Sequence, residues 1–519
     1  MNASEKKEDY LPILKKAAVV VVCLLMVIVA GQVKYRENYN YLNSNATWHV
    51  LFTIQAYDET PASVHKFLPI VSFGDDFDKE IQWAEMVSDG NGNYYYTSFS
   101  PAGFVLPYLF FKLIHLPVTE GSLYLFNTVL CCIALLLCMR LFCDLFRDTL
   151  QETYICILVT LLFAFQTEIL QGMGMVYWHQ SLMQVLLAAQ FLNFYHFKEK
   201  KSWRIAFFVI CFLMPYVEWT GCIANVGFAI ALFFNNGLHV KGKNFLWVFL
   251  SGLCTIGSLG VLILHYLSVI DWNGFRQALQ DRYMMRTRYA YATTFNLVWG
   301  YWKSFKTFWV ILLVLFVACC IIHKGLKWIK QWGAILPMLF VMCFPLLENL
   351  VMKEHAISYT YDRMKLVYPM LLAAVVMIVS IAQKWDSAWT KRVITVVIAG
   401  ISIYNLIAYT KNTELLWPAD YREKNERIAE ECMENYHEDS LYGMEGAAVR
   451  GYMNMLFHRG IYENVTEEEL LGLAEERGAK YAVLITPAAE PSPDNCQCMY
   501  AVDHVTIIDV DTGLKKVVQ

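Results

Sequence analysis

The sequence predicts an α-helical polytopic membrane protein of about 11 transmembrane helices, with outer juxtamembrane helices and a small C-terminal α/β domain. Of the 519 residues, 57% are hydrophobic and 17% are charged, whereas a soluble chain carries about 25% charged residues. Apolar runs of roughly 17–25 residues, long enough to cross a bilayer, recur along the chain. Residues 412–519 differ, because charged helical patterns alternate there with strand-like runs.

The transmembrane segments can be placed from hydrophobic runs and their sides from lysine and arginine bias. The candidate apolar segments are 17–32, 101–116, 120–146, 152–170, 178–197, 203–217, 220–236, 244–268, 304–323, 331–349, 364–384 and 391–410. The first follows Lys15 and Lys16 and lacks a cleavage site, so it is expected to be an uncleaved span with a cytoplasmic N-terminus.

Four short connections are basic, which predicts that they are cytoplasmic: 198–204, 239–244, 323–330 and 384–392. Counting outward places the loops 33–100, 269–303 and 350–363, and the C-terminal domain, on the outer side. Twelve spans would return the C-terminus to the cytoplasm, so one of the twelve segments is expected not to cross the membrane. Segment 101–116 begins with Pro and Gly and contains Pro107 and Lys112, so it is expected to be an outer juxtamembrane helix. A count of twelve spans is the alternative.

Two domains follow: a multi-span domain over 1–411 and an extracytoplasmic α/β domain over 412–519. In the second, "TEEELLGLAEERGAKYAVLIT" (466–486) predicts a capped helix leading into a strand, because Thr466 and Glu469 have capping-box spacing. "DHVTIIDVD" (503–511) predicts a further strand. The net charge of −4 gives no basic surface for nucleic acid.

Polar and aromatic residues from distant segments are predicted to lie together at the outer membrane face. Each has a plainer reading, since loop acids are usually solvated and aromatics at span ends usually form an interfacial belt. Glu218 is harder to explain in this way, because an acid between two apolar helices is costly unless it is paired or faces water. The candidate catalytic residues are Asp58 and Glu59. The candidate substrate-binding residues are His65, Tyr177, His179, Glu218, Arg282, Arg286, Arg288, His355, Tyr361, Arg363 and Lys365.

Together these groups suit chemistry on a lipid-linked phosphate at the membrane boundary. Arginine and lysine bind phosphate through charge-assisted hydrogen bonds. A carboxylate can take the proton from an attacking hydroxyl or amine. Aromatic rings can stack on sugar faces.

Several of these motifs resemble the type C integral-membrane glycosyltransferases, which include protein O-mannosyltransferases and aminoarabinose transferases. The motifs are "YDE" (57–59), "YYYTSFSPAGFVLPYLFFKL" (94–113), "YWHQSLMQ" (177–184), "YVEWTG" (216–221) and "EHAISYTYDRMKLVYP" (354–369). One departure is Ser100, which stands where many members have a proline.

The resemblance implies an inverting transferase that moves a sugar from a polyprenyl-phosphate donor to a glycan, lipid or protein acceptor outside the cell membrane. It implies that Asp58 or Glu59 is the base, and that Arg363, with Lys365, binds the donor phosphate. Some members need a divalent cation, but no ligand spacing here supports one, so no metal ligands are predicted. The sugar, the acceptor and the oligomeric state cannot be inferred from the sequence.

Other functions remain open. A lipid-linked polysaccharide ligase or polymerase would act on similar donors through a large late loop. A flippase-type transporter would place charges or broken helices near the midplane of the membrane, usually with an internal repeat. A non-catalytic scaffold would tolerate loss of the first-loop acids.

Overall fold

The computed structural model describes residues 44–81, 86–234, 243–288, 291–385, 387–411, 421–446, 450–488 and 501–519, with single positions 17, 21, 24, 25 and 28. The chain folds into two compact units. The first comprises 1–33, 124–262 and 283–412, and the second comprises 34–123, 263–282 and 413–519. The predicted first span, 17–32, and the predicted boundary near residue 411 lie largely outside the described residues, so both stay predictions.

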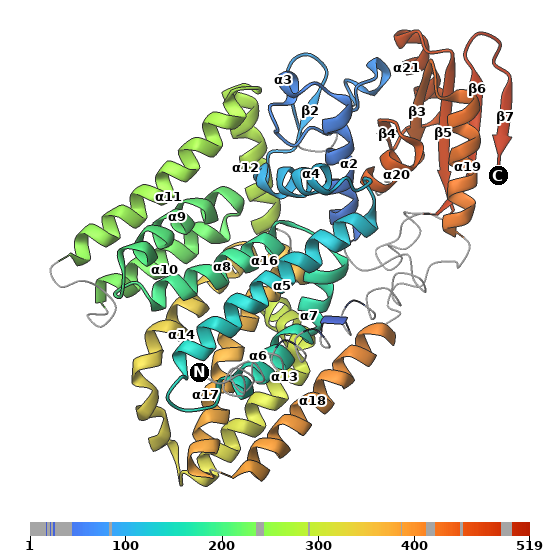
Figure 1. Ribbon diagram of the computed structural model, residues 1–519. Helices are drawn as coiled ribbons and strands as arrows, with labels where there is room; N and C mark the ends of the chain where they lie inside the picture. The colour runs from blue at the N-terminus through green and yellow to red at the C-terminus, as the bar shows by residue number, and fades with distance from the viewer. Residues whose placement is uncertain are drawn as a thin grey trace, which may run out of the picture. The chain divides into compact units, whose positions relative to one another are not determined.

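The first unit is built from apolar helices (Figure 1). Its elements are α5 (Glu120–Leu145), α6 (Glu152–Ala164), α7 (Thr167–Leu170), the π-helix η2 (Gln171–Met175), α8 (His179–Tyr195), α9 (Lys201–Val217), α10 (Thr220–Phe234), α11 (Asn244–Leu267), α13 (Thr294–Ile322), η3 (Leu326–Ile335), α14 (Leu336–Cys343), η4 (Phe344–Leu346), α15 (Leu347–Val351), α16 (Lys353–Ser358), η5 (Thr360–Leu366), α17 (Val367–Lys384) and α18 (Ala388–Lys411).

Within the described part of the chain, six helices are long and apolar enough to cross a membrane. They span Glu120–Leu145, Asn244–Leu267, Thr294–Ile322, Leu326–Val351, Thr360–Lys384 and Ala388–Thr410. Helices α8, α9 and α10 have 17, 17 and 15 residues, at or below the lower limit for a straight crossing. The chain is therefore a multi-span membrane protein, while the count of eleven spans stays a prediction.

The predicted continuous segment 152–170 is broken. Helices α6 and α7 meet at a bend of 72°, and Gln166 between them is extended, with φ −75° and ψ 136°. The chain then continues into η2, whose turned-out carbonyls at Gly172 and Gly174 accept hydrogen bonds from the Asn127 amide at 3.3 and 3.1 Å. Asn127 thus satisfies backbone groups that a bent apolar helix leaves open, a role that hydropathy alone does not reveal.

The second unit contains the first loop and the C-terminal domain. Its loop elements are α2 (Ser44–Glu59), α3 (Ala62–His65), η1 (Asp76–Asp78), β1 (Val87–Ser88), β2 (Tyr94–Tyr95), α4 (Ala102–Ile114) and most of α12 (Trp272–Arg288). Helix α4 is the predicted juxtamembrane helix, and at 13 residues it is too short to span a bilayer.

The C-terminal domain is a sheet with helices on both faces (Figure 1). Its elements are α19 (Tyr421–Tyr436), β3 (Ser440–Met444), α20 (Arg450–Phe457), β4 (Ile461–Glu463), α21 (Glu467–Arg477), β5 (Tyr481–Pro487), β6 (Val502–Asp509) and β7 (Lys515–Val518). Among the described residues the strand order is β4-β3-β5-β6-β7. Strand β3 is parallel to β4 and β5, and the pairs β5–β6 and β6–β7 are antiparallel.

Alternation along the strands divides the core of this domain into two layers. Tyr442, Val483 and Ile507 face α19 and α20, whereas their neighbours Leu441 and Ala482 face α21. The predicted capped helix and both predicted strands are confirmed. Helix α21 begins with the expected Thr466–Glu469 capping box and ends at Gly478, whose φ is 67°.

Helix α20 lies against α2 so closely that a side chain is not tolerated at one position. A Cβ added to Gly451 would lie 2.8 Å from the backbone N of His49 and 2.8 Å from the carbonyl carbon of Trp48. The Trp48 ring also meets Tyr452 edge-on, with centroids 5.0 Å apart. The C-terminal domain therefore packs directly on the first loop.

Gly451→Ala is expected to lower the free energy of unfolding by about 1–3 kcal/mol, because backbone atoms of α2 must move to admit the methyl group. Gly472→Ala is the matched control, since Gly472 in α21 has open space around it, and alanine there should stabilise the helix by about 0.4–1 kcal/mol. Denaturant unfolding of the full chain in detergent measures both. Equal effects of the two substitutions would contradict the close packing.

Candidate functional site

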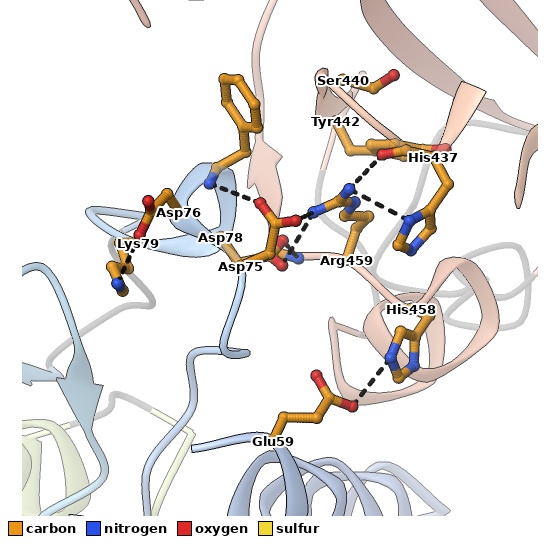
Figure 2. Close-up of polar contacts among 12 residues, drawn as sticks. Glu59, Asp75, Asp76, Asp78, Lys79, His437, Ser440, Tyr442, His458 and Arg459 are labelled. Carbon is orange, nitrogen blue, oxygen red and sulfur yellow. Dashed lines mark hydrogen bonds and ion pairs between the residues drawn. The ribbon is translucent and has the colours of Figure 1, made fainter. Parts of the chain in front are cut away.

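Glu59, the last residue of α2, is held by a histidine from the C-terminal domain. The His458 Nε2 atom lies 2.9 Å from Glu59 Oε1 (Figure 2). The Gln55 amide, one turn back along α2, donates to the same oxygen at 2.8 Å. Gly74 lies against the end of this helix, where a Cβ would be 2.7 Å from the Glu59 carbonyl oxygen. The Glu59 carboxylate is therefore fixed on a rigid helix end.

The two partners shift one another's pKa values. Burial raises the pKa of Glu59, but the hydrogen bonds from His458 and Gln55 outweigh it and leave that pKa below its ordinary value of 4.5. The hydrogen bond to Glu59 raises the pKa of His458 above 6.5, against the effect of burial. Glu59 is therefore ionised at neutral pH and can accept a proton.

Asp58, the other candidate base, has a different partner. Its Oδ1 forms an ion pair with Lys112 of α4 at 2.7 Å. The Lys112 ammonium also lies over the Tyr108 ring, 5.5 Å from its centroid. The two adjacent acids are thus held by different segments, Asp58 by the juxtamembrane helix and Glu59 by the C-terminal domain.

Arg459, which follows His458 in the C-terminal domain, is buried against the first loop (Figure 2). Arg459 Nη1 lies 2.8 Å from Asp75 and 3.3 Å from Asp78, and the guanidinium also donates to the carbonyl oxygen of His437. Asp78 accepts from the Gly460 N–H as well. Burial raises the pKa of Asp78 to about 6, although Arg459 opposes this shift.

His65 and Arg282 also belong to the second unit. His65 is buried, and its Nδ1 accepts the Phe67 N–H at 2.8 Å while its ring lies 4.7 Å from that of Tyr57. These contacts hold the turn after α3, and the substrate-binding role of His65 stays a prediction. The Arg282 guanidinium lies over the Tyr96 ring, 5.7 Å from its centroid.

In the first unit, buried charged residues gather around Asp362. Lys365 forms ion pairs with Glu348 and, at 3.0 Å, with Asp362. The His355 Nδ1 atom lies 3.3 Å from the second Asp362 oxygen. Glu218 is joined to this group by Gln180, whose amide donates to Glu218 at 3.3 Å and to Asp362 at 3.4 Å.

Three buried carboxylates of this cluster lie close together. Glu218, Glu348 and Asp362 can each bring an oxygen within 4.8 Å of the others, and Lys365 is the ammonium that contacts two of them. In the described structure, the Oε2 of Glu218, the Oε1 of Gln180 and the Oδ1 of Asn349 are buried without a hydrogen-bond partner. Carboxylate and amide oxygens are ligands of hard divalent cations, so these residues fit such an ion.

Arg286 and Glu354 form a further ion pair in the first unit. Their side chains meet at 2.5 Å, and Tyr291 and Ser358 donate to the other Glu354 oxygen at 3.0 and 2.8 Å. Burial alone would raise the pKa of Glu354, but the charge and hydrogen bond of Arg286 hold it below its ordinary value. Arg288 ends α12, and its side chain lies outside the described residues.

Arg363 is buried against α13, where a glycine makes room for it. A Cβ on Gly300 would lie 2.5 Å from the Arg363 Nη1 atom. The Arg363 Nε atom has no hydrogen-bond partner among the described residues. Tyr361, two residues earlier, is buried with its ring 5.5 Å from that of Tyr359.

Tyr177 and His179 stand where η2 leads into α8, and both are buried. The Tyr177 ring meets Phe126 of α5 edge-on, with centroids 5.4 Å apart. His179 is the first residue of α8 and lies next to Gln180, which enters the Asp362 cluster.

The structure thus brings the predicted residues together in two groups. Glu218, His355 and Lys365 share the cluster around Asp362, whereas Asp58, Glu59, His65 and Arg282 belong to the second unit. One pocket joining all of them stays a prediction.

The residues that sequence reasoning missed are Gln180, Asp362, His458 and Arg459. Asp362 was within reach, because it lies one helical turn before Lys365. Gln180 stands inside a quoted motif, but nothing in the spacing ties it to acids elsewhere. His458 carries no signal, because its partner lies at the other end of the chain.

No protein-family model matches the sequence, and no curated protein matches it. Solved structures do match. ArnT from Cupriavidus metallidurans, bound to undecaprenyl phosphate, superposes with a TM-score of 0.56 at 10% identity, covering 91% of this chain and 93% of ArnT.

The oligosaccharyltransferase of Archaeoglobus fulgidus also matches. Its apo form has a TM-score of 0.52 at 12% identity, covering 91% of this chain and 69% of that one. Its complex with an inhibitory peptide and a dolichol-phosphate has a TM-score of 0.50 at 11% identity, covering 91% of this chain and 69% of that one. Both proteins are type C glycosyltransferases. The fold of this chain is therefore that of the type C glycosyltransferases, which confirms the resemblance found in the sequence.

Lys365→Met should lower the free energy of unfolding by about 3–5 kcal/mol, because it leaves the buried carboxylates of Glu348 and Asp362 without their ammonium partner. Adding Glu348→Gln should recover part of the loss. Lys353→Met, at a lysine that is not fully buried, is the control and should cost less than about 0.5 kcal/mol. Unfolding in detergent compares the three variants, and equal losses at both lysines would contradict the buried network.

Proposed function

We propose that this protein is a glycosyltransferase that moves a sugar from a polyprenyl-phosphate donor to an acceptor on the outer face of the cell membrane. The observation that carries the proposal is its fold. It follows ArnT, solved with undecaprenyl phosphate, over 91% of the chain. The ionised first-loop carboxylate supplies a base at the end of a rigid helix.

In this reaction the acceptor oxygen or nitrogen forms a bond to the anomeric carbon of the sugar. The bond between that carbon and the phosphate oxygen breaks, and polyprenyl phosphate leaves as the anion. The acceptor's proton goes to the carboxylate of Glu59 or Asp58. Attack opposite the leaving phosphate inverts the anomeric centre.

Arg363 is the proposed ligand of the donor phosphate. Its buried Nε–H has no partner among the described residues, and a buried N–H of this kind is costly unless a ligand meets it. Lys365 is engaged with Glu348 and Asp362 and Arg286 with Glu354, whereas the charge of Arg363 acts on the buried carboxyl of Glu168. Lys365 would therefore hold the carboxylates of Glu348 and Asp362 in place and would not bind the phosphate itself.

A divalent cation is a second part of the proposal. Glu218, Glu348 and Asp362 would hold it, because each can bring one carboxylate oxygen within 4.8 Å of the others. When bound, such a cation stabilises negative charge on a phosphate leaving group. The amides of Gln180 and Asn349 and the ammonium of Lys365 would orient the carboxylate of Asp362.

The transporter alternative is favoured by one observation, the bend of 72° between α6 and α7. Broken helices are a feature of transporters, where they line the substrate path. Sugar transfer and transport differ in their requirement for a base, so the two functions can be told apart by the first-loop acids.

Glu59→Gln or Asp58→Asn, whichever removes the base, should lower transfer by about 10²–10⁴-fold with normal expression. Release of polyprenyl phosphate from a panel of undecaprenyl-phosphate sugars in proteoliposomes measures this. Asp76→Asn is the control, because that side chain is 93% exposed. Full activity of both single variants and of the double variant would remove the proposed base and favour the transporter.

Mg²⁺ or Mn²⁺ should stabilise the purified protein against unfolding, by about 2.7 kcal/mol at a concentration a hundred times the dissociation constant. Glu218→Gln should abolish this effect, because it removes a ligand. Glu463→Gln, at a residue in the C-terminal domain, is the control and should keep it. An equal shift in all three proteins, or none in the wild type, would overturn the cation site.

A further inference from the structure

The C-terminal domain reaches the end of α2 through one turn of chain. Helix α20 lies along α2 at Gly451 and Tyr452, and it ends at Phe457. The next residue, His458, has a φ of 51°, in the left-handed region where a helix usually ends with glycine. A histidine there is strained, and such strain persists where surrounding contacts hold it.

The contacts that hold this turn are those with the first loop. The His458 ring stacks on Phe73, with centroids 4.9 Å apart, and its Nε2 meets Glu59. Arg459 turns the other way, toward Asp75 and Asp78 (Figure 2). A Cβ on Gly460 would lie 3.2 Å from the Asp78 carbonyl oxygen, so three consecutive residues of the C-terminal domain fit against the first loop.

We propose that His458 is a positioning residue for Glu59, and that the C-terminal domain is thereby part of the first-loop site. The role of His458 in catalysis rests on the proposed function, whereas the contact between His458 and Glu59 does not. The contact also distinguishes the two acids, because Asp58 pairs with Lys112 instead. Glu59 is accordingly the base, with its orientation set from Oε1 by His458 and Gln55.

The positioning contact should depend on pH. The pKa of His458 lies above its ordinary value of 6.5 and that of Glu59 below its ordinary value of 4.5. The ion pair therefore contributes fully between these two ordinary values and is lost as the pH rises through the higher pKa of folded His458. It is also lost at low pH, as Glu59 takes up a proton.

Other charged groups around His458 modify this dependence. Asp78 favours the protonated imidazole and Arg459 disfavours it. The ring of His437 lies 6.1 Å away in a stacked arrangement, and Asp75 pairs with Arg459. Asp78 itself has a pKa of about 6, so its charge increases over part of the range in which His458 releases its proton.

Two substitutions separate the parts of this contact. His458→Gln keeps a side-chain N–H that can donate to Glu59 but cannot titrate. His458→Phe keeps the stacking on Phe73 and removes the donor. His504→Gln is the matched control, because His504 is a histidine of the same domain whose Nδ1 lies 2.9 Å from its neighbour Asp503.

Hydrogen exchange of the full-length protein in detergent tests the proposal without any sugar transfer. Amides at the end of α2 and around Gly74 are followed from about pH 5.5 to about pH 8.5, a range that spans histidine titration. Protection in the wild type and in the His504→Gln control should fall about tenfold across this range, because the charge-assisted bond to Glu59 is lost.

Protection in His458→Gln should change little with pH, and in His458→Phe it should be about tenfold lower at the acidic end. Identical pH profiles in the wild type and His458→Gln, or full protection in His458→Phe, would overturn the positioning role.

Transfer kinetics form a separate arm. If Glu59→Gln removes transfer, His458→Gln should change the pH profile of kcat while leaving KM for the donor unchanged. An unchanged profile of kcat would overturn the link to catalysis. If Glu59→Gln is fully active while the exchange results hold, the contact stands and the proposed base fails.

Discussion

The arrangement of the second unit depends on the ion pairs that the buried guanidinium of Arg459 forms with two acids of the first loop. Arg459 is among the largest fully buried side chains of the described structure, and a buried charge is stable only when its partners are well placed. Its partners Asp75 and Asp78 come from the first loop. Because the cost of separating them is high, Arg459 holds the C-terminal domain in register with the loop, and His458 beside it is brought to Glu59.

A similar constraint governs the first unit. Charged side chains at the ends of apolar helices are expensive unless they meet one another or water. Lys365 forms ion pairs with two of the three carboxylates there. The amides of Gln180 and Asn349 donate to Asp362. The remaining acceptors are those on which a cation site is proposed. The polar groups of this cluster therefore depend on one another for their hydrogen bonds and ion pairs.

Both arrangements are compatible with the proposed transferase. The fold matches proteins solved with undecaprenyl phosphate and with dolichol-phosphate. A general base must lie within hydrogen-bond reach of the proton that it removes. The carboxylate of Glu59, the proposed base, is held at the end of α2 by His458 and Gln55.

The sequence by itself determined the membrane class and the strands and capped helix of the C-terminal domain, whereas the outer position of α4 stays a prediction. These features depend on local periodicity and capping, which neighbouring residues set. The break after α6 was not predicted, because the hydropathy of 152–170 is continuous and the compensating amide comes from Asn127 on another helix.

The tertiary structure decided the partners of the charged residues. Sequence analysis singled out Glu59 and Lys365 as site residues without assigning them ion-pair partners, and only folding brought His458 to Glu59 and Glu348 to Lys365. Pairing between distant residues leaves no local pattern, because it is set by which surfaces the packed helices and the sheet bring within a few ångströms of each other.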